Sequence, residues 1–216
     1  MINTHSFVPA LLLTLAASTA FATEGGSANP VEKSFRTAME QHLATQGSVC
    51  LGKFDWPVEV SEQDFQTGSR DAVQMPVLEE LGLVMSSQES VQVADAKEKI
   101  TVKHYTMTDA GRRYYIEKES VTGTGATRTE HHRDLCPVRL GLDKIVRWDA
   151  LKAVGDMQET TLTYTYKVTA ADWTRNPAAQ KVFPMIDRIV QGAGTLQLQQ
   201  RLRLTKQGWV AVAPTE

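Results

Sequence analysis

The chain is poor in cysteine, has no excess of either charge and lacks a long apolar run. Its 216 residues include 2 Cys, and 23 Lys and Arg stand against 25 Asp and Glu, which gives a net charge of −2. A nearly neutral chain has no general attraction for nucleic acid or for an anionic membrane, so either interaction would need a local basic patch. Because a membrane-spanning helix needs about 20 apolar residues, we expect no integral membrane segment in the mature chain.

The first 22 residues have the pattern of an export signal. Residues 7–17 are apolar apart from one proline and one threonine, a run too short to cross a bilayer. Ala20, Phe21 and Ala22 then form a small-x-small cleavage pattern, although no Lys or Arg precedes the apolar run. We therefore expect cleavage near Ala22 and a periplasmic or secreted mature chain that begins at Thr23. A buried N-terminal helix is the alternative.

The two cysteines, Cys50 and Cys136, predict a disulfide, because an even cysteine count in an oxidising compartment favours pairing. The bond would close a loop of about 86 residues, for which the chain-entropy model gives about 4–5 kcal/mol of stabilisation. Two buried free thiols are the alternative. Neither cysteine lies in a pattern typical of a catalytic nucleophile.

Apolar spacing and turn residues predict an α+β fold. Apolar side chains recur at helical spacing after Pro30 and again over Arg70 to Leu81, and Ile100 to Met107 alternates like a strand. Thr108 then has the position of a helix cap. These elements make up a first lobe, residues 23–120.

The clearest strand pattern lies in the second half of the chain. Apolar residues alternate there with three threonines and a lysine: Leu162, Tyr164, Tyr166 and Val168. Such alternation predicts one buried and one solvated face, as in an antiparallel sheet. We expect a second lobe, residues 129–216, made of an antiparallel β-sheet with one packed helix.

Two stretches in the first lobe carry a resemblance. They are "LEELGLV", which begins at Leu78, and "YTMTDAGRRYY", which ends at Tyr115. Residues 78–115 are similar to the recognition-helix and wing portion of winged-helix domains. The resemblance implies that the leucines pack the helix, that Gly82 turns the chain into the wing and that Thr108 starts the next helix.

The mature chain as a whole resembles an uncharacterised family of exported proteobacterial proteins. The stretches that carry this likeness are "VCLGKFDWPVEV", "YTMTDAGRRYY", "CPVRLGLDKIVRW", "YTYKVTAADW" and "VFP". The resemblance implies a fold and an exported location, and it implies no particular chemistry.

The helix that would read DNA in a winged-helix domain is acidic in this chain. Asp71, Glu79 and Glu80 lie on it, and Arg70 is its one candidate for a base contact. A helix in the major groove needs Arg, Lys, Asn or Gln toward the bases and cations near phosphates. We therefore expect no nucleic-acid partner and keep nucleic-acid binding through this lobe as an unfavoured alternative.

The stretch "EHHRDLC", Glu130 to Cys136, offers the densest set of ligand-type side chains. His131 and His132 are candidate ligand or metal residues. Adjacent side chains on a strand point to opposite faces, however, and no metal-binding spacing is present. A solvated strand is the favoured interpretation, with no metal and no cofactor.

The wing region is locally basic, with Arg112, Arg113, Lys97, Lys99, Lys103 and Lys118. Arg112, Arg113 and Lys103 are candidates for a surface contact with an anionic partner or lipid headgroups. Glutamates are interspersed, so an ordinary charged face is the alternative. No catalytic motif is present, and we assign no catalytic residue.

The sequence thus predicts an exported α+β protein with a winged-helix-like N-terminal lobe. We expect a non-enzymatic binding or accessory role through contacts with an envelope protein or a cell-surface component. The alternative is a small hydrolase or metal-dependent enzyme that uses His131 or His132.

Overall fold

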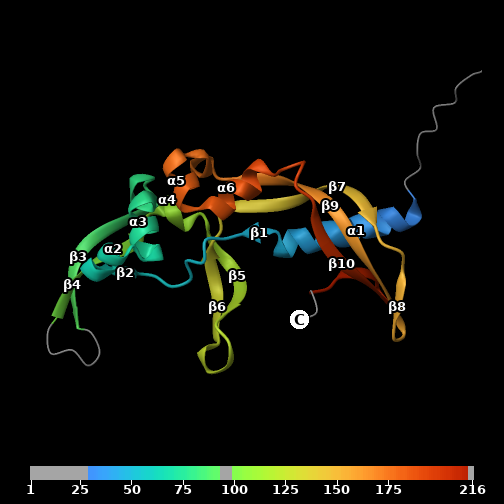
Figure 1. Cartoon of the computed structure of the whole chain (residues 1–216), viewed down its shortest axis with the longest axis horizontal. Coiled ribbons are helices and arrows are strands. Elements are labelled where there is room, and N and C mark those ends of the chain that lie inside the picture. Colours follow the sequence, from blue (N-terminus) through green and yellow to red (C-terminus); the bar gives the residue numbers. More distant parts are fainter. Residues whose placement is uncertain (1–28, 93–98, 214–216) are drawn as a thin grey trace, which may run out of the picture.

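The computed structural model describes residues 29–92 and 99–213. The predicted export signal, residues 1–22, lies outside the described residues. The described part has a mixed α+β fold with three antiparallel sheets. Figure 1 shows an elongated arrangement, with a curled sheet around α1 at one end and a smaller sheet with α2 and α3 at the other.

The large sheet has six strands in the order β1-β7-β9-β10-β11, with β8 paired to β9. Its strands are β1 Ser48–Val49, β7 Val138–Trp148, β8 Lys152–Val154, β9 Met157–Ala170, β10 Leu198–Thr205 and β11 Gly208–Ala211. Helix α1, Pro30–Gln46, lies against this sheet. It begins where the Asn29 side chain accepts the N–H of Val31 at 3.0 Å, with proline in the first turn.

Helix α1 packs on strands of the large sheet that come much later in the sequence. The ring of Phe35 packs edge-to-face against Trp148 and Trp209, with ring centroids 5.6 and 4.9 Å apart. Together with Met39 it shares one buried cluster with Leu162 of β9. The helix therefore packs on the large sheet, where it covers the apolar face of β9.

The alternation in β9 is confirmed on its apolar face. Leu162, Tyr164 and Tyr166 are buried in the cluster with α1. The opposite face is not fully solvated as expected, because Thr163 and Thr165 are buried as well. The Thr165 hydroxyl donates to an Asp143 carboxylate oxygen at 2.7 Å, so hydrogen bonding offsets its loss of water.

The smaller sheet has the order β2-β4-β3. The elements of this end are β2 Val58–Ser61, α2 Glu62–Thr67, α3 Arg70–Glu80, β3 Val84–Gln92 and β4 Lys99–Met107. The predicted helix over 70–81 is confirmed to within one residue and continues through Pro76. The winged-helix likeness of this region stays a prediction.

Capping side chains begin three helices: α2, α3 and the short helix that follows β4. Ser61 and Asp64 form a capping box at the start of α2, and Ser69 accepts the N–H of Ala72 at the start of α3. Thr108 accepts the N–H of Gly111 at 3.2 Å and so begins the short helix α4, Asp109–Arg112. The predicted helix start at Thr108 is confirmed.

A hairpin projects from the middle of the molecule, on the side away from α5 and α6 (Figure 1). Its strands are β5 Tyr115–Thr122 and β6 Thr129–Leu135, with the 3-10 turn η1, Gly125–Thr127, between them. The register of this pair shifts between Glu117 and Ser120. Residues 118 and 119 therefore leave the regular ladder.

The expected single packed helix is divided into shorter pieces in the described residues. They are η2 Asp172–Arg175, α5 Pro177–Val182 and α6 Pro184–Gln191. The break has local causes. Asn176 caps the start of α5, and Pro184 begins α6 at a position where a helix makes no use of the backbone N–H that proline lacks. Phe183 and Ile186 are buried in one cluster with Met75 and Leu78 of α3, which joins the two ends of the fold.

The predicted disulfide is confirmed. Cys50 follows β1 and Cys136 follows β6, and the bond links residues 86 apart in the sequence. Among the described residues, no helix is both long and apolar enough to cross a membrane.

Candidate binding groove

A groove of about 560 Å³ lies where the two ends of the fold meet. Its lining comes from β1 and the loop after it, from α3, from β5 and β6, and from the junction of α5 and α6. Cys50 of the disulfide lies on its surface. The groove therefore depends on chain segments that are far apart in the sequence.

One wall of the groove is apolar and is formed by residues 182–186. Phe183 and Ile186 are buried, but Met185 is 69% exposed. Proline at 184 begins α6 and turns the chain so that these neighbours line one surface. The wall can pack against apolar side chains, and Met185 offers a flexible contact.

Gln74 and Ser120 line the groove, and each has a buried side-chain oxygen without a partner in the described part of the chain. The Gln74 side chain donates from Nε2 to the Val182 carbonyl oxygen at 3.1 Å, which orients its amide. Its Oε1 accepts nothing, and neither does the Ser120 hydroxyl oxygen. Buried polar atoms are normally paired, so these two indicate a place where a ligand can supply hydrogen bonds.

Two cations line the same groove. The Arg70 guanidinium donates to the Leu51 carbonyl oxygen, and Lys118 donates to the side-chain oxygen of Gln46 at 2.8 Å. Gly52 has φ of 68°, and a Cβ there would lie 3.2 Å from the guanidinium. Within residues 29–92 and 99–213, neither cation has a carboxylate at ion-pair distance.

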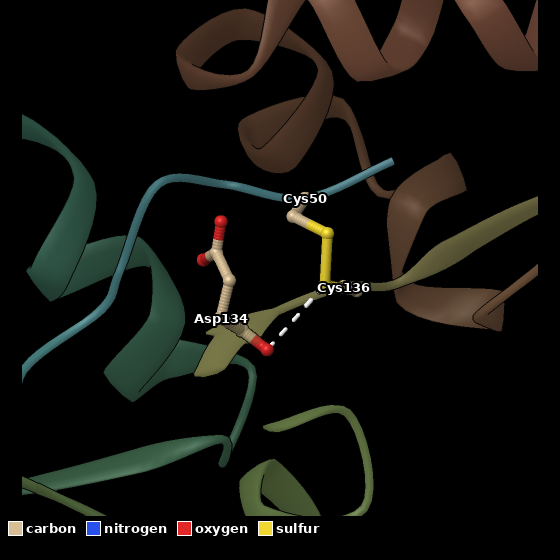
Figure 2. A group of neighbouring side chains, drawn as sticks. All are labelled: Cys50, Asp134 and Cys136. Atoms are coloured by element: carbon tan, nitrogen blue, oxygen red, sulfur yellow. Dashed lines mark hydrogen bonds between the residues drawn. A yellow bond between two sulfur atoms is a disulfide. The ribbon is translucent and has the colours of Figure 1, made fainter. Parts of the chain in front are cut away.

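The buried carboxylate of Asp134 holds one side of the groove in place. Figure 2 shows its side chain directed toward the chain segment after Cys50. It accepts backbone N–H bonds from Gly52 at 3.0 Å, and from Lys53 and Leu135 at 2.7 Å each. Burial raises the pKa of Asp134, against the lowering effect of these bonds and of Arg70. Its bonds are satisfied by backbone, so its role is structural.

The donor atoms of Cys50, Asp134 and Cys136 lie within 4.8 Å of one another. A metal would need the two sulfurs as thiolates. The disulfide consumes both, so this group does not bind a metal in its oxidised form. The Cys136 sulfur also lies 3.4 Å from the Asp134 carbonyl oxygen (Figure 2), but a disulfide sulfur has no proton to donate.

Behind the groove, the buried Lys53 ammonium pairs with the carboxylate of Asp71. The Lys53 side chain is 3% exposed and that of Asp71 is 44% exposed. Burial lowers the pKa of Lys53, and the hydrogen bond and charge of Asp71 raise it in part. The pair packs the loop after Cys50 against α3.

The structure does not bring His131 and His132 together. His131 is buried, stacks on Phe54 with ring centroids 3.9 Å apart, and its Nε2 lies 2.8 Å from the Thr122 hydroxyl. His132 is exposed on the other face beside Glu119. They form no common ligand set, as expected for neighbours on a strand.

The candidate contact residues of the wing region do not form the groove. Lys103 of β4 lies 3.7 Å from a Glu79 carboxylate oxygen, and Arg112 lies 3.7 Å from Asp109. Arg113 is exposed at the end of α4. Two basic residues considered from the sequence do line the groove: Arg70, which was considered only for a DNA contact, and Lys118, which belongs to the basic set around the wing.

Comparison of this chain with protein-family models, with curated proteins and with solved structures found no match.

Proposed function

We propose that this chain is an exported, non-enzymatic binding protein that holds an envelope or cell-surface partner in the groove. The N-terminal sequence pattern predicts export, and a disulfide is compatible with an oxidising compartment. The observation that carries the binding role is the set of unpaired groups in the groove. Gln74 Oε1 and the Ser120 hydroxyl lack partners in the described chain, beside two cations without carboxylates and an apolar wall.

This combination fits binding better than catalysis. The buried carboxylate, Asp134, is already satisfied by three backbone N–H groups. A general base must reach a substrate proton, and no groove histidine stands beside Asp134 among the described lining residues. Few polar groups placed around an apolar surface are typical of a binding site.

Site-specific photocrosslinking in the producing cell tests this function. The substitution Met185→p-benzoylphenylalanine places the probe on the exposed wall of the groove. Met157→p-benzoylphenylalanine is the matched control, because Met157 is 41% exposed on β9 outside the groove. We expect a discrete adduct from position 185 alone, and its loss when Lys118→Glu is added. Equal amounts of adduct at both positions would contradict the function. So would an adduct at position 185 whose amount is unchanged by Lys118→Glu.

A further inference from the structure

Strand β1 is an open edge of the large sheet and lines the groove. Among the described strands it pairs only with β7, through Ser48 with Arg139 and Val49 with Val138. The Leu140 N–H donates to the Gly47 carbonyl oxygen, so ladder bonds fall on alternate residues. By this alternation the backbone of Val49 faces β7, and the backbones of Ser48 and Cys50 face away from it.

Cys50 supports this alternation. In the described part of the chain, its backbone N–H and C=O have no hydrogen-bond partner. An unpaired edge is a template for another extended chain. A partner strand laid along β1 would satisfy these groups in the way that peptide-binding domains extend a sheet.

Strand β5 adds Lys118 and Ser120 to the groove lining, and among the described strands it pairs only with β6. The Lys118 bond to Gln46 holds β5 beside the end of α1, next to β1. Lys118 lies at the register shift and leaves the regular ladder with β6, whereas Ser120 is back in the ladder opposite His131; both residues line the groove. A polypeptide on β1 would therefore find two further hydrogen-bonding residues in the groove lining, Ser120 and Gln74.

The two cations of the groove indicate which charge the bound polypeptide carries. Among the described residues, Arg70 and Lys118 have no carboxylate at ion-pair distance. The charge of Arg70 acts on Asp134, but that carboxylate is held by backbone N–H groups. An acidic side chain or a terminal carboxylate would pair with these cations, with charge-assisted hydrogen bonds. An acyl chain could fill the apolar wall, but it could not pair with the backbone groups of β1.

We propose that the occupant of the groove is an extended polypeptide of a partner protein, which adds to β1 as a strand. Its apolar side chains pack on residues 182–186, and its carboxylate pairs with Arg70 and Lys118. This inference rests on the proposed function, because it names the ligand class of the same groove.

Selection from a random decapeptide library on the mature protein tests the proposal. An enriched peptide is synthesised, and its affinity is measured by fluorescence anisotropy. Single N-methylation along the peptide removes one backbone donor at a time. Because alternate residues of a strand face its partner and Ser48 and Cys50 form the free edge, we expect losses of about tenfold or more at two positions that lie two residues apart.

Charge variants complete the experiment. Lys118→Glu should weaken the peptide at least about tenfold, and amidation of its carboxylate should do the same to the wild-type complex. Lys144→Glu is the charge-matched control on β7, outside the groove, and should leave affinity unchanged.

The contrary outcomes separate the two proposals. Loss of affinity in Lys118→Glu without a two-residue N-methylation pattern would keep the groove as the site and overturn strand addition. A peptide unaffected by Lys118→Glu binds elsewhere and contradicts the inference, and so does a library from which no peptide is enriched. If oleate vesicles suppress the photocrosslink at position 185 and no peptide binds the protein, the ligand of the groove is a lipid and the inference is overturned. The photocrosslink at position 185 judges the proposed function independently.

Discussion

The carboxylate of Asp134 accepts the backbone N–H of Lys53 at 2.7 Å across 81 residues of sequence. Asp134 lies two residues before Cys136, and Lys53 lies three residues after Cys50, so this bond and the disulfide fasten the same two segments. One segment continues from β1 and the other ends β6. Their attachment holds β1 at the edge of the groove.

Asp134→Asn should destabilise the fold by about 1–3 kcal/mol, because an amide nitrogen cannot accept one of the three backbone N–H groups and leaves it unpaired. Chemical denaturation measures the change. Asp156→Asn, on the exposed β8–β9 turn, is the control and should change stability by less than about 0.5 kcal/mol. Equal effects of the two substitutions would show that the Asp134 bonds contribute little.

Substitution of Asp71 should destabilise the fold more than substitution of its partner Lys53. Asp71→Ala leaves a buried ammonium without its partner and should cost about 2–3 kcal/mol, less than for a fully buried pair because Asp71 is partly exposed. Lys53→Met should change stability by less than about 1 kcal/mol, since the freed carboxylate can be hydrated. Denaturant unfolding of both variants checks this order, and a larger loss in Lys53→Met would reverse it.

Lys53 should also make stability depend on alkaline pH. Its pKa is lowered in the folded chain from the ordinary value of 10.5. In the window just below 10.5 the unfolded chain therefore binds more protons, and the Lys53 contribution to stability rises with pH. The stability difference between wild type and Lys53→Met, measured at several pH values from 8 to 10.5, should grow in favour of wild type. A difference that shrinks with pH would contradict the lowered pKa.

Loss of the disulfide should cost about 4–5 kcal/mol in the chain-entropy model, which is an upper value for a loop of this length. Urea unfolding with and without a phosphine reductant measures this loss of unfolding free energy. In the control variant, Cys50→Ala/Cys136→Ala, the reductant should not change the unfolding free energy. Peptide mapping without reduction should show the two cysteine peptides linked. Two free thiols in exported protein would contradict the pairing.

Local signals predicted local structure well. The helix over residues 70–81, the cap at Thr108 and the apolar face of β9 each depend on neighbours a few residues apart, and each is present. The position of α1 was not predictable in this way. The apolar face of α1 predicts that the helix packs against another element. It does not identify that element as β9, which lies more than 100 residues later in the sequence.

The groove was missed for the same reason. It is assembled from residues 48–52, 70–74, 118–134 and 182–186, and no periodicity relates these segments. One local signal was present in the sequence: the apolar run over residues 182–186 contains Pro184, which a simple buried helix would not. In the structure Met185 of this run is exposed. The buried partnerless atoms of Gln74 and Ser120 can be found only once the chain is folded.

Residue-resolved amide hydrogen exchange, with and without an enriched decapeptide, tests the central claim most directly. If the peptide adds to β1, the amide hydrogens of Ser48 and Cys50 should exchange at least about tenfold more slowly in the complex, because they gain partners. The Val49 amide, which already faces β7, should change little. Bound peptide with unchanged exchange at Ser48 and Cys50, and new protection on a surface outside the groove, would contradict the account.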